Sequence, residues 1–168
     1  MTALPMLNSS LWERLVSPFT ATKLRAGTCA WVVDIHSHLV PGIDDGVKDS
    51  AQALACLKQL VQWGIRKIIT TPHVSLDWYP NKTNAIREGQ RFLQALIEEH
   101  QLPLCVEVAA EYMVDDSFFD LLQTGDLLSF GQERYLLIET GWASAPNHID
   151  DILFRIKTHG YRPVLAHP

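Results

Sequence analysis

The chain has 168 residues, of which 47% are hydrophobic and 20% charged, as expected for one domain with a full hydrophobic core. Acidic residues outnumber Lys and Arg by 19 to 14, and basic residues neither form a block nor alternate with aromatic ones. These features argue against a nucleic-acid partner. No apolar run approaches the ~20 residues of a membrane span, and the first residues do not resemble a signal peptide, so a cytoplasmic protein is expected.

Short apolar runs alternate with segments of helical periodicity from residue 31 onward. Strands are expected at 31–35, 67–72, 104–109, 135–139 and 163–166. Helices are expected at 50–63 with a stop at Gly64, from an N-cap at Thr83 to just before Pro103, at 116–123, and from an N-cap at Asn147 to a stop at Gly160. This alternation predicts an α/β fold of parallel strands, either a doubly wound sheet or a barrel. Residues 1–30 show only a weak helical pattern at 9–16 and form an expected extension.

His36 and His38 directly follow the first expected strand, in the stretch VVDIHSHLVPGIDDG. Residues two apart on a strand point the same way, so the two imidazoles can meet at one point, with Asp34 one step earlier. Asp44 and Asp45 stand in the next loop. Imidazole and carboxylate ligands together suit Zn, Mn or Fe. Paired histidines of this kind also occur as hydrogen-bonded structure, and the other strand ends must decide between the two interpretations.

The other expected strands end in further groups of the same kind. His73 follows the second strand, Glu111 the third and His167 the fifth. In parallel α/β proteins the carboxyl ends of the strands form one edge, where ligands bind. These three residues are therefore expected to join the first histidine pair in one metal site. Glu139 ends the fourth strand, and its pattern fits this edge and a solvent-facing position equally well.

Two histidines are expected to have structural roles. His100 and His159 stand where helices end, and a histidine there interacts favourably with the last carbonyl groups. Asp34 fits two roles, as a metal ligand or as the acceptor that orients a ligand histidine. Trp63 is expected to pack, whereas the aromatic residues that are candidates for a substrate pocket are Trp78, Trp142 and Tyr112.

The cysteines give no sign of thiol chemistry. Cys29, Cys56 and Cys105 form no C-x-x-C pair, and none is followed six positions later by the arginine of a phosphate-binding thiolate loop. Reduced, mostly buried thiols are expected. The sequence also lacks a glycine-rich nucleotide loop and a G-x-S-x-G elbow, which disfavours nucleotide-cradle and serine-hydrolase chemistry.

Five segments carry a resemblance to a known family. DIHSHLVPGIDDG, ITTPHV, AAEYMVDDSF, RYLLIET and YRPVLAHP occur in this order within residues 31–168. With them the sequence resembles the polymerase-and-histidinol-phosphatase (PHP) superfamily, and within it the bacterial manganese-dependent tyrosine-protein phosphatases associated with capsule and exopolysaccharide operons. The resemblance implies a distorted, TIM-like, seven-stranded β/α barrel. It also implies two or three divalent ions at the rim, Mn in the first place, with Fe or Zn as alternatives.

The resemblance also implies a ligand set. The residues that match metal ligands of the family are His36, His38, Asp44, His73, Glu111 and His167. Near residue 150, where some relatives have a ligand histidine, this chain has Asp150 and, two positions earlier, His148; with Asp34 they are candidates for a ligand or a supporting role. The family continues past the AHP motif to an arginine-containing segment and an Asp-x-His pair. Residues 31–168 are thus expected to be the N-terminal portion of the domain, with about five strands.

The implied function is metal-dependent hydrolysis of phosphotyrosine on proteins, in the regulation of capsule or exopolysaccharide synthesis. A bacterial tyrosine kinase is the candidate partner, and an oligomer is compatible with the sequence. The expected nucleophile is a metal-bound hydroxide, so no side chain is assigned that role. Two alternatives stay open: a small-molecule phosphatase of the histidinol-phosphatase kind, and a non-catalytic remnant that binds metal or a partner kinase. An amidohydrolase is disfavoured because no lysine is expected at the rim.

Overall fold

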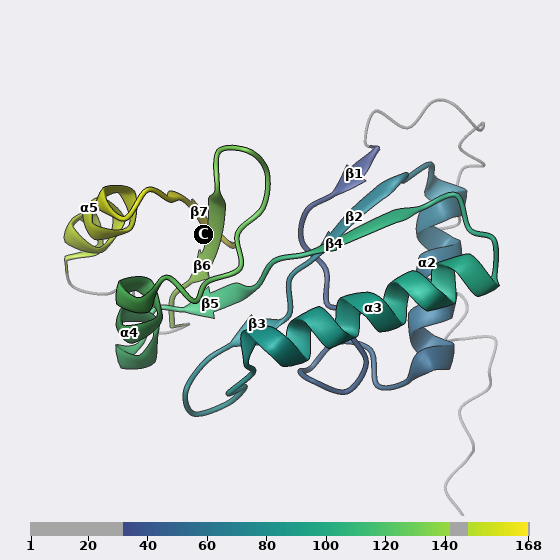
Figure 1. Cartoon of the computed structure of the whole chain (residues 1–168), viewed down its shortest axis with the longest axis horizontal. Helices are drawn as coiled ribbons and strands as arrows, with labels where there is room; N and C mark the ends of the chain where they lie inside the picture. The colour runs from purple at the N-terminus through teal and green to yellow at the C-terminus, as the bar shows by residue number, and fades with distance from the viewer. Residues whose placement is uncertain (1–31, 142–147, 168) are drawn as a thin grey trace, which may run out of the picture.

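The computed structural model describes residues 32–141 and 148–167 (Figure 1), and the structural statements below concern these residues. The strands are β1 (Val33–Asp34), β2 (Lys67–Thr70), β3 (His73–Val74), β4 (Cys105–Val108), β5 (Glu111–Met113), β6 (Tyr135–Glu139) and β7 (Arg162–Leu165). The helices are α2 (Ser50–Trp63), α3 (Thr83–Glu99), α4 (Asp116–Thr124) and α5 (Ile149–Thr158). The expected extension at 1–30, with its helical pattern at 9–16, and the expected cap Asn147 lie outside the described residues.

The strands form two sheets, each made of parallel strands, and two stretches of the chain run from the first sheet into the second. One sheet has the order β1-β2-β4 and the other β3-β5-β6-β7, and every pairing is parallel. β2 runs on into β3 and β4 into β5 (Figure 1), so the strands expected at 67–72 and 104–109 end earlier, and each is followed by a short further strand that was not expected. Hydrogen bonds continue across the break, from Ala109 N to Thr70 O and from Glu111 N to Pro72 O, both 3.0 Å. Pro72 has no N–H to donate, which interrupts the ladder there.

The order of the strands distinguishes the two sequence-based alternatives. The strands lie side by side in the order in which they follow one another along the chain, as in a β/α barrel. In a doubly wound sheet, by contrast, later strands are added on the other side of the first strand. The expected parallel α/β class is confirmed. Among the described residues, however, the sheets do not close, because β1 and β7 each pair on one side only. The seven-stranded barrel therefore stays a prediction.

Helix ends show which local signals were interpreted correctly. Asp49 caps α2 by accepting a hydrogen bond from Gln52 N at 2.8 Å, and Gly64 ends the helix at a φ of 97°, as expected. The expected cap of α3 is wrong: Thr83 is already helical, and the extended Lys82 before it is the N-cap. At α5 the N-cap is His148, in a left-handed conformation with a φ of 68°.

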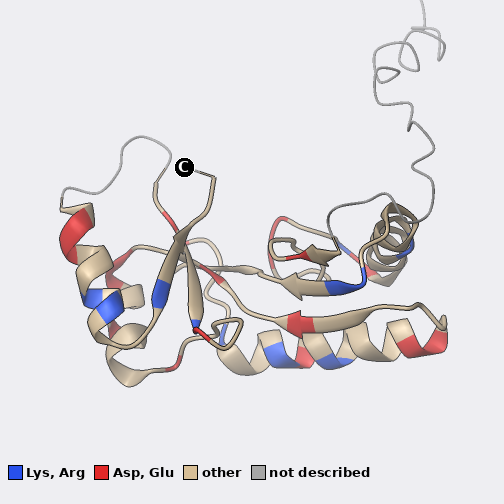
Figure 2. Ribbon diagram, turned by 90° about the horizontal axis from the view of Figure 1, so that it is seen from above, with Lys and Arg blue, Asp and Glu red and all other residues tan. Residues whose placement is uncertain are grey.

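Two clusters of buried apolar side chains lie between the sheets and the helices. The first, around Leu57 and Leu93, joins α2 and α3 to the β1-β2-β4 sheet. The second, around Phe118 and Ile156, joins α4 and α5 to the other sheet. Basic and acidic residues alternate along α3 (Figure 2), so this helix carries no uninterrupted run of basic residues for nucleic acid. No helix of the described residues is long and apolar enough to cross a membrane.

The contact between α3 and Val40 leaves no room for a side chain at Gly89. A Cβ atom there would lie 2.2 Å from Cγ1 and 2.8 Å from Cγ2 of Val40. Alanine has a helix propensity about 1 kcal/mol better than glycine. We nevertheless expect Gly89→Ala to lower the free energy of unfolding by about 1–3 kcal/mol, because a close-packed core takes up an extra methyl group only with strain. Urea denaturation measures the change.

The double variant Gly89→Ala, Val40→Ala is the control for this prediction. Val40→Ala alone loses buried apolar contacts, but in the Gly89→Ala background it also removes the methyl groups that clash. The two free-energy changes should therefore be less than additive. A Gly89→Ala variant that is as stable as the parent would contradict the close packing.

Candidate metal centre

The carboxyl ends of the strands bring together all six residues that the family resemblance marks as ligands. They are His36, His38, Asp44, His73, Glu111 and His167, and each contacts at least one other member. The chain elements explain the convergence. Glu111 begins β5 directly beside His73 at the start of β3, because these two residues are paired in the parallel ladder.

Glu111 is the centre of the cluster. Its side chain is fully buried, and Oε1 lies 2.9 Å from Nε2 of His167 and 3.7 Å from Nε2 of His36. Oε2 lies 3.3 Å from Nε2 of His38 and 3.4 Å from Nδ1 of His73. Among the described residues, this buried oxygen has no hydrogen-bond partner. A buried carboxylate oxygen without a partner is costly, and four surrounding imidazoles with such an oxygen between them fit a divalent cation.

Two imidazoles are held by their other ring nitrogen. Nδ1 of His36 hydrogen-bonds to Oγ1 of Thr71 at 2.7 Å, and Nδ1 of His38 hydrogen-bonds to Oδ2 of Asp44 at 2.8 Å. Both rings thus turn Nε2 toward Glu111. Metal-ligating histidines usually have this arrangement, in which one nitrogen is fixed by a partner and the other is left for the ion.

Asp44 contacts the histidines mainly as an anchor. It is 7% exposed and accepts hydrogen bonds from the backbone N–H of His73 at 3.0 Å and of Gly46 at 2.9 Å, besides its bond with His38. Asp45, which the sequence analysis left unassigned, has its Oδ1 3.5 Å from Nε2 of His73. Of the two aspartates it is the one in a potential ligand group, and a ligand role for Asp44 stays a prediction.

In the described part of the chain, three groups of His, Asp and Glu side chains have ligand atoms within 4.8 Å of one another. They are His36 with Glu111 and His167, His38 with Asp45 and His73, and His73 with Glu111 and Glu139. The groups adjoin because they share members. Carboxylates can bridge two cations, so this arrangement has the donors for more than one ion.

Glu139, whose role the sequence left open, belongs to the cluster. It is 5% exposed at the end of β6, and its Oε1 lies 2.7 Å from Nδ1 of His73. The ring of Tyr79 stacks on His73 with a centroid distance of 5.3 Å and an interplanar angle of 14°. Thr71 and Tyr79 had no signal in the sequence, since neither is a usual ligand type and both act through a histidine.

The remaining candidates lie around or outside the cluster. Oδ1 of Asp34 accepts a hydrogen bond from His36 N at 3.3 Å, which is a supporting contact. His148 and Asp150 stand at the start of α5, both exposed, and His148 lies 3.9 Å from Asp151. Neither occurs in the three potential ligand groups of the described residues, so the structure does not bring them into the centre.

Burial and ion pairing shift the pKa values of the cluster in opposite directions. Burial disfavours the charged form of His38, but its hydrogen bond to Asp44 and the nearby carboxylate of Glu111 outweigh burial and raise the pKa of His38 to about 9. Burial would raise the pKa of Glu111, yet the nearby imidazoles of His38, His36 and His73 lower it. Burial dominates at His36 and lowers its pKa. At neutral pH the ion-free cluster thus holds a proton on His38 and a charge on Glu111.

Metal binding should therefore release a proton and strengthen with pH. His38 must be neutral to bind an ion, and its folded pKa of about 9 lies above the ordinary histidine pKa of 6.5. Protonation of His38 stabilises the ion-free fold fully below pH 6.5, and this contribution is lost as the pH rises toward 9. Affinity for Mn²⁺ should increase over the same interval, by up to about tenfold per pH unit for one proton.

Isothermal titration of the ion-free protein measures this linkage. Two buffers with different enthalpies of ionisation give the number of protons released at each pH. The His38→Gln variant is the control, because it removes the titrating group, and its pH dependence should be shallower. An affinity that is flat with pH, without proton release, would contradict the pKa assignment of His38.

A cavity of about 620 Å³ adjoins the cluster. It is lined by Asp45, His73, Ser75, Trp78, Tyr79, Met113, Glu139, Gly141 and His167. Trp78, a pocket candidate from the sequence, is among them and is 78% exposed. Tyr112 lies in the core at 2% exposure, and Trp142 lies outside the described residues. The expected packing of Trp63 is wrong, since it is 49% exposed at the end of α2.

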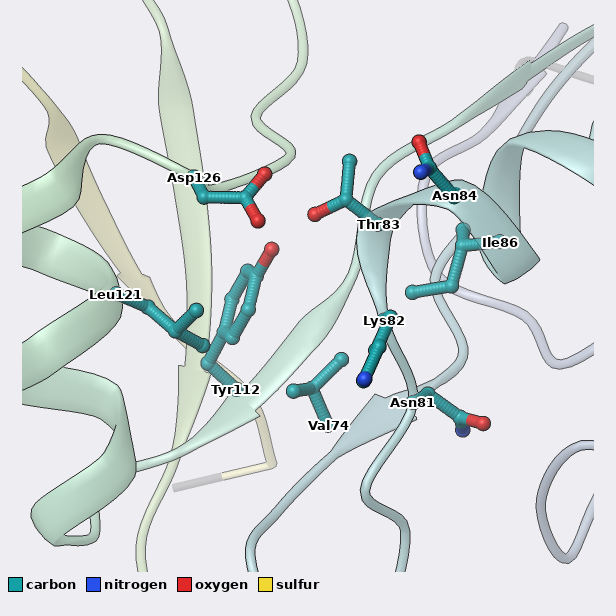
Figure 3. A pocket seen from close by; sticks show the side chains of 9 residues that line it. All are labelled: Val74, Asn81, Lys82, Thr83, Asn84, Ile86, Tyr112, Leu121 and Asp126. Atoms are coloured by element: carbon teal, nitrogen blue, oxygen red, sulfur yellow. The ribbon is translucent and has the colours of Figure 1, made fainter.

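A second cavity of about 310 Å³ lies at the start of α3 (Figure 3). Val74, Ile86 and Leu121 form apolar parts of its lining, and Lys82 and Asp126 are charged parts. No member of the histidine cluster lines it. The cavity beside the cluster is therefore the candidate for chemistry.

Comparison with known proteins finds relatives that are named tyrosine-protein phosphatases. The chain is 34% identical over 137 residues to the tyrosine-protein phosphatase YwqE of Bacillus subtilis, covering 82% of this chain and 54% of YwqE. It is 27% identical over 136 residues to the tyrosine-protein phosphatase CpsB of Streptococcus pneumoniae, covering 81% of this chain and 56% of CpsB. The chain thus spans about half the length of these curated relatives.

The structural comparison agrees with the sequence comparison. The fold matches a chain from the crystal structures of YwqE and CpsB, described as unique metal-dependent tyrosine phosphatases, with a TM-score of 0.75 and 34% identity. The match covers 81% of this chain and 55% of that one. The family model for capsular polysaccharide synthesis proteins of the CpsB/CapC type matches residues 32–168. The chain belongs to the CpsB/CapC family.

Proposed function

We propose that this chain carries the metal centre of a protein-tyrosine phosphatase that acts in capsule or exopolysaccharide synthesis. The observation that carries the proposal is the buried Glu111, whose two oxygens face four imidazoles. The names of the relatives support the reaction, and the family description supports the process. The proposed substrate is phosphotyrosine on a protein, with a tyrosine kinase of the same process as the candidate partner.

The proposed cofactor is two or three divalent ions, with Mn²⁺ first and Fe or Zn as alternatives. The proposed ligands are His36, His38, His73, Glu111 and His167, with a carboxylate from Asp44 or Asp45. When bound, such ions lower the pKa of water and stabilise negative charge on a phosphoryl group. Histidine and carboxylate donors fit this ion class, and the unpartnered oxygen of Glu111 fits a cation.

The side chains of this centre are proposed to hold the ions and to orient the ligand rings. None is proposed as a nucleophile. Thr71 and Asp44 fix the rings of His36 and His38, and Glu139 with Tyr79 fixes His73. Fixed rings keep the ligand atoms in place without reorganisation during the reaction.

We also propose that residues 31–168 form a portion of a PHP-type barrel with seven strands. The order of the strands supports this, since they follow one another as in a barrel. Within residues 32–141 and 148–167, β1 and β7 each pair on one side only, which supports it as well, because further parallel strands can pair there.

One assay separates this function from a small-molecule phosphatase. The chain is loaded with Mn²⁺, its metal content is measured by mass spectrometry, and its rates on a phosphotyrosine peptide and on histidinol phosphate are compared. We expect bound metal and a higher kcat/KM for the peptide. Preference for histidinol phosphate would identify a small-molecule enzyme, and bound metal without turnover of either substrate would identify a non-catalytic metal-binding chain.

A further inference from the structure

The loop between β3 and α3 is held in one shape by its own hydrogen bonds. The buried Ser75 accepts hydrogen bonds at Oγ from Trp78 N at 3.3 Å and from Tyr79 N at 3.1 Å. Ser75 N donates in turn to Tyr79 O at 2.9 Å. Asn81 closes the loop, since its Nδ2 donates to the carbonyls of Ile43 and His73, both at 2.9 Å.

The same loop is tied to α4. Leu76 N donates to Oδ2 of Asp115 at 2.9 Å, and Asp115 also caps α4 through its bond from Phe118 N at 3.0 Å. The loop is therefore ordered at both ends and in the middle. Despite this order, it presents the indole of Trp78 to solvent at 78% exposure. A solvent-exposed indole on an ordered loop beside a cavity offers apolar surface to a ligand, which is typical of a binding site.

The cavity beside this indole has two chemically different parts. Asp45, His73, Glu139 and His167 from the metal centre line one part. Trp78, Tyr79 and Met113 line the rest with aromatic and thioether surface. The stacking of Tyr79 on His73 joins the two parts directly. A ligand with a phosphate group on an uncharged ring matches both parts, because the phosphate suits the metal centre and the ring suits the aromatic and thioether side chains.

We propose that Trp78, with Tyr79 and Met113, binds the ring of an aromatic phosphate ester whose phosphate lies at the metal centre. The loop thereby selects aromatic over aliphatic phosphate esters. Indole, phenol and thioether groups favour an aromatic ring through stacking and sulfur–aromatic contacts that an alkyl chain cannot make. The phosphate end rests on the proposed function; the choice of ring is a separate property of Trp78.

Binding of two phosphonates to the Zn²⁺-loaded chain tests the proposal. Benzylphosphonate and butylphosphonate carry the same charged group and have no ester bond to hydrolyse, and Zn²⁺ is diamagnetic and suits imidazole ligands. In NMR spectra of the indole N–H groups, benzylphosphonate should shift the Trp78 signal. It should bind about three- to tenfold more tightly than butylphosphonate.

The variant Trp78→Ala should lower the affinity for benzylphosphonate to that for butylphosphonate, and leave the latter unchanged. Trp63→Ala is the matched control, because Trp63 is also exposed but ends α2, outside the cavity lining. Equal affinities in the parent chain, or equal losses for both ligands in Trp78→Ala, would overturn the proposal while leaving the phosphatase function intact. Failure to bind either phosphonate would overturn the proposal too, and the metal and turnover assay above then decides separately on the function.

Discussion

Replacing Glu111 with glutamine should reduce metal retention and phosphatase turnover by about a hundredfold or more. Each of the two carboxylate oxygens of Glu111 lies 2.9–3.7 Å from ring nitrogens of two histidines. The amide has nearly the same size but no charge, and its nitrogen cannot accept or bridge. Metal content by mass spectrometry and turnover of a phosphotyrosine peptide measure the two effects.

Glu107→Gln is the matched control for this substitution. Glu107 lies on β4, in the same chain segment as Glu111, but is 44% exposed and pairs with Lys67. Exposed ion pairs contribute about 0–1 kcal/mol, so metal content and turnover should not change. An unchanged circular dichroism spectrum shows that the Glu111→Gln variant is folded. Full metal occupancy in this folded variant would contradict the central role of Glu111.

Chelation should abolish activity, whereas alkylation of thiols should leave it. The proposed chemistry depends on the ions held by the histidine cluster, so EDTA removes its basis. Of the described cysteines, Cys105 is exposed at the start of β4, the end of its segment away from Glu111, and Cys56 is half-buried in α2. Neither occurs in a potential ligand group.

Activity is measured after EDTA, after iodoacetamide, and after EDTA followed by added Mn²⁺. The third sample is the control, since recovery shows that the chelator acted on the ions and did not denature the chain. EDTA should also lower the melting temperature, because an ion that binds only the folded state stabilises that state. Activity that survives EDTA and is lost with iodoacetamide would reverse the assignment from metal to thiol chemistry.

The sequence predicted the fold where local chemistry decides it. Gly64 ends α2 because glycine adopts the left-handed conformation there at little cost, and this signal is local. The start of α3 was missed, because Lys82 takes the extended cap conformation without any side-chain bond, so no residue preference marks it. The break after β2 was missed because the expected strand was continued through Pro72, although proline has no N–H to donate to the ladder. The break after β4 was missed because the apolar pattern of residues 104–109 does not mark it.

The centre was predictable to the extent that strand ends determine position. His73 and Glu111 follow successive strands, and their register in the parallel ladder brings them side by side. Glu139 was left open because its exposure depends on packing of its neighbours, and a strand-end carboxylate fits both outcomes. Asp45 and Tyr79 lie in loops, where two neighbouring residues face different directions and only the three-dimensional path decides which one reaches His73.

The strand order has a consequence for how the chain matures. Each new strand finds its pairing edge already exposed by the strand made before it, so the sheet can grow at one edge during synthesis. Among the described residues the donors arrive in the same order: His36 and His38 precede Glu111, and His167 follows it. A nascent chain thus presents paired imidazoles long before it can enclose an ion.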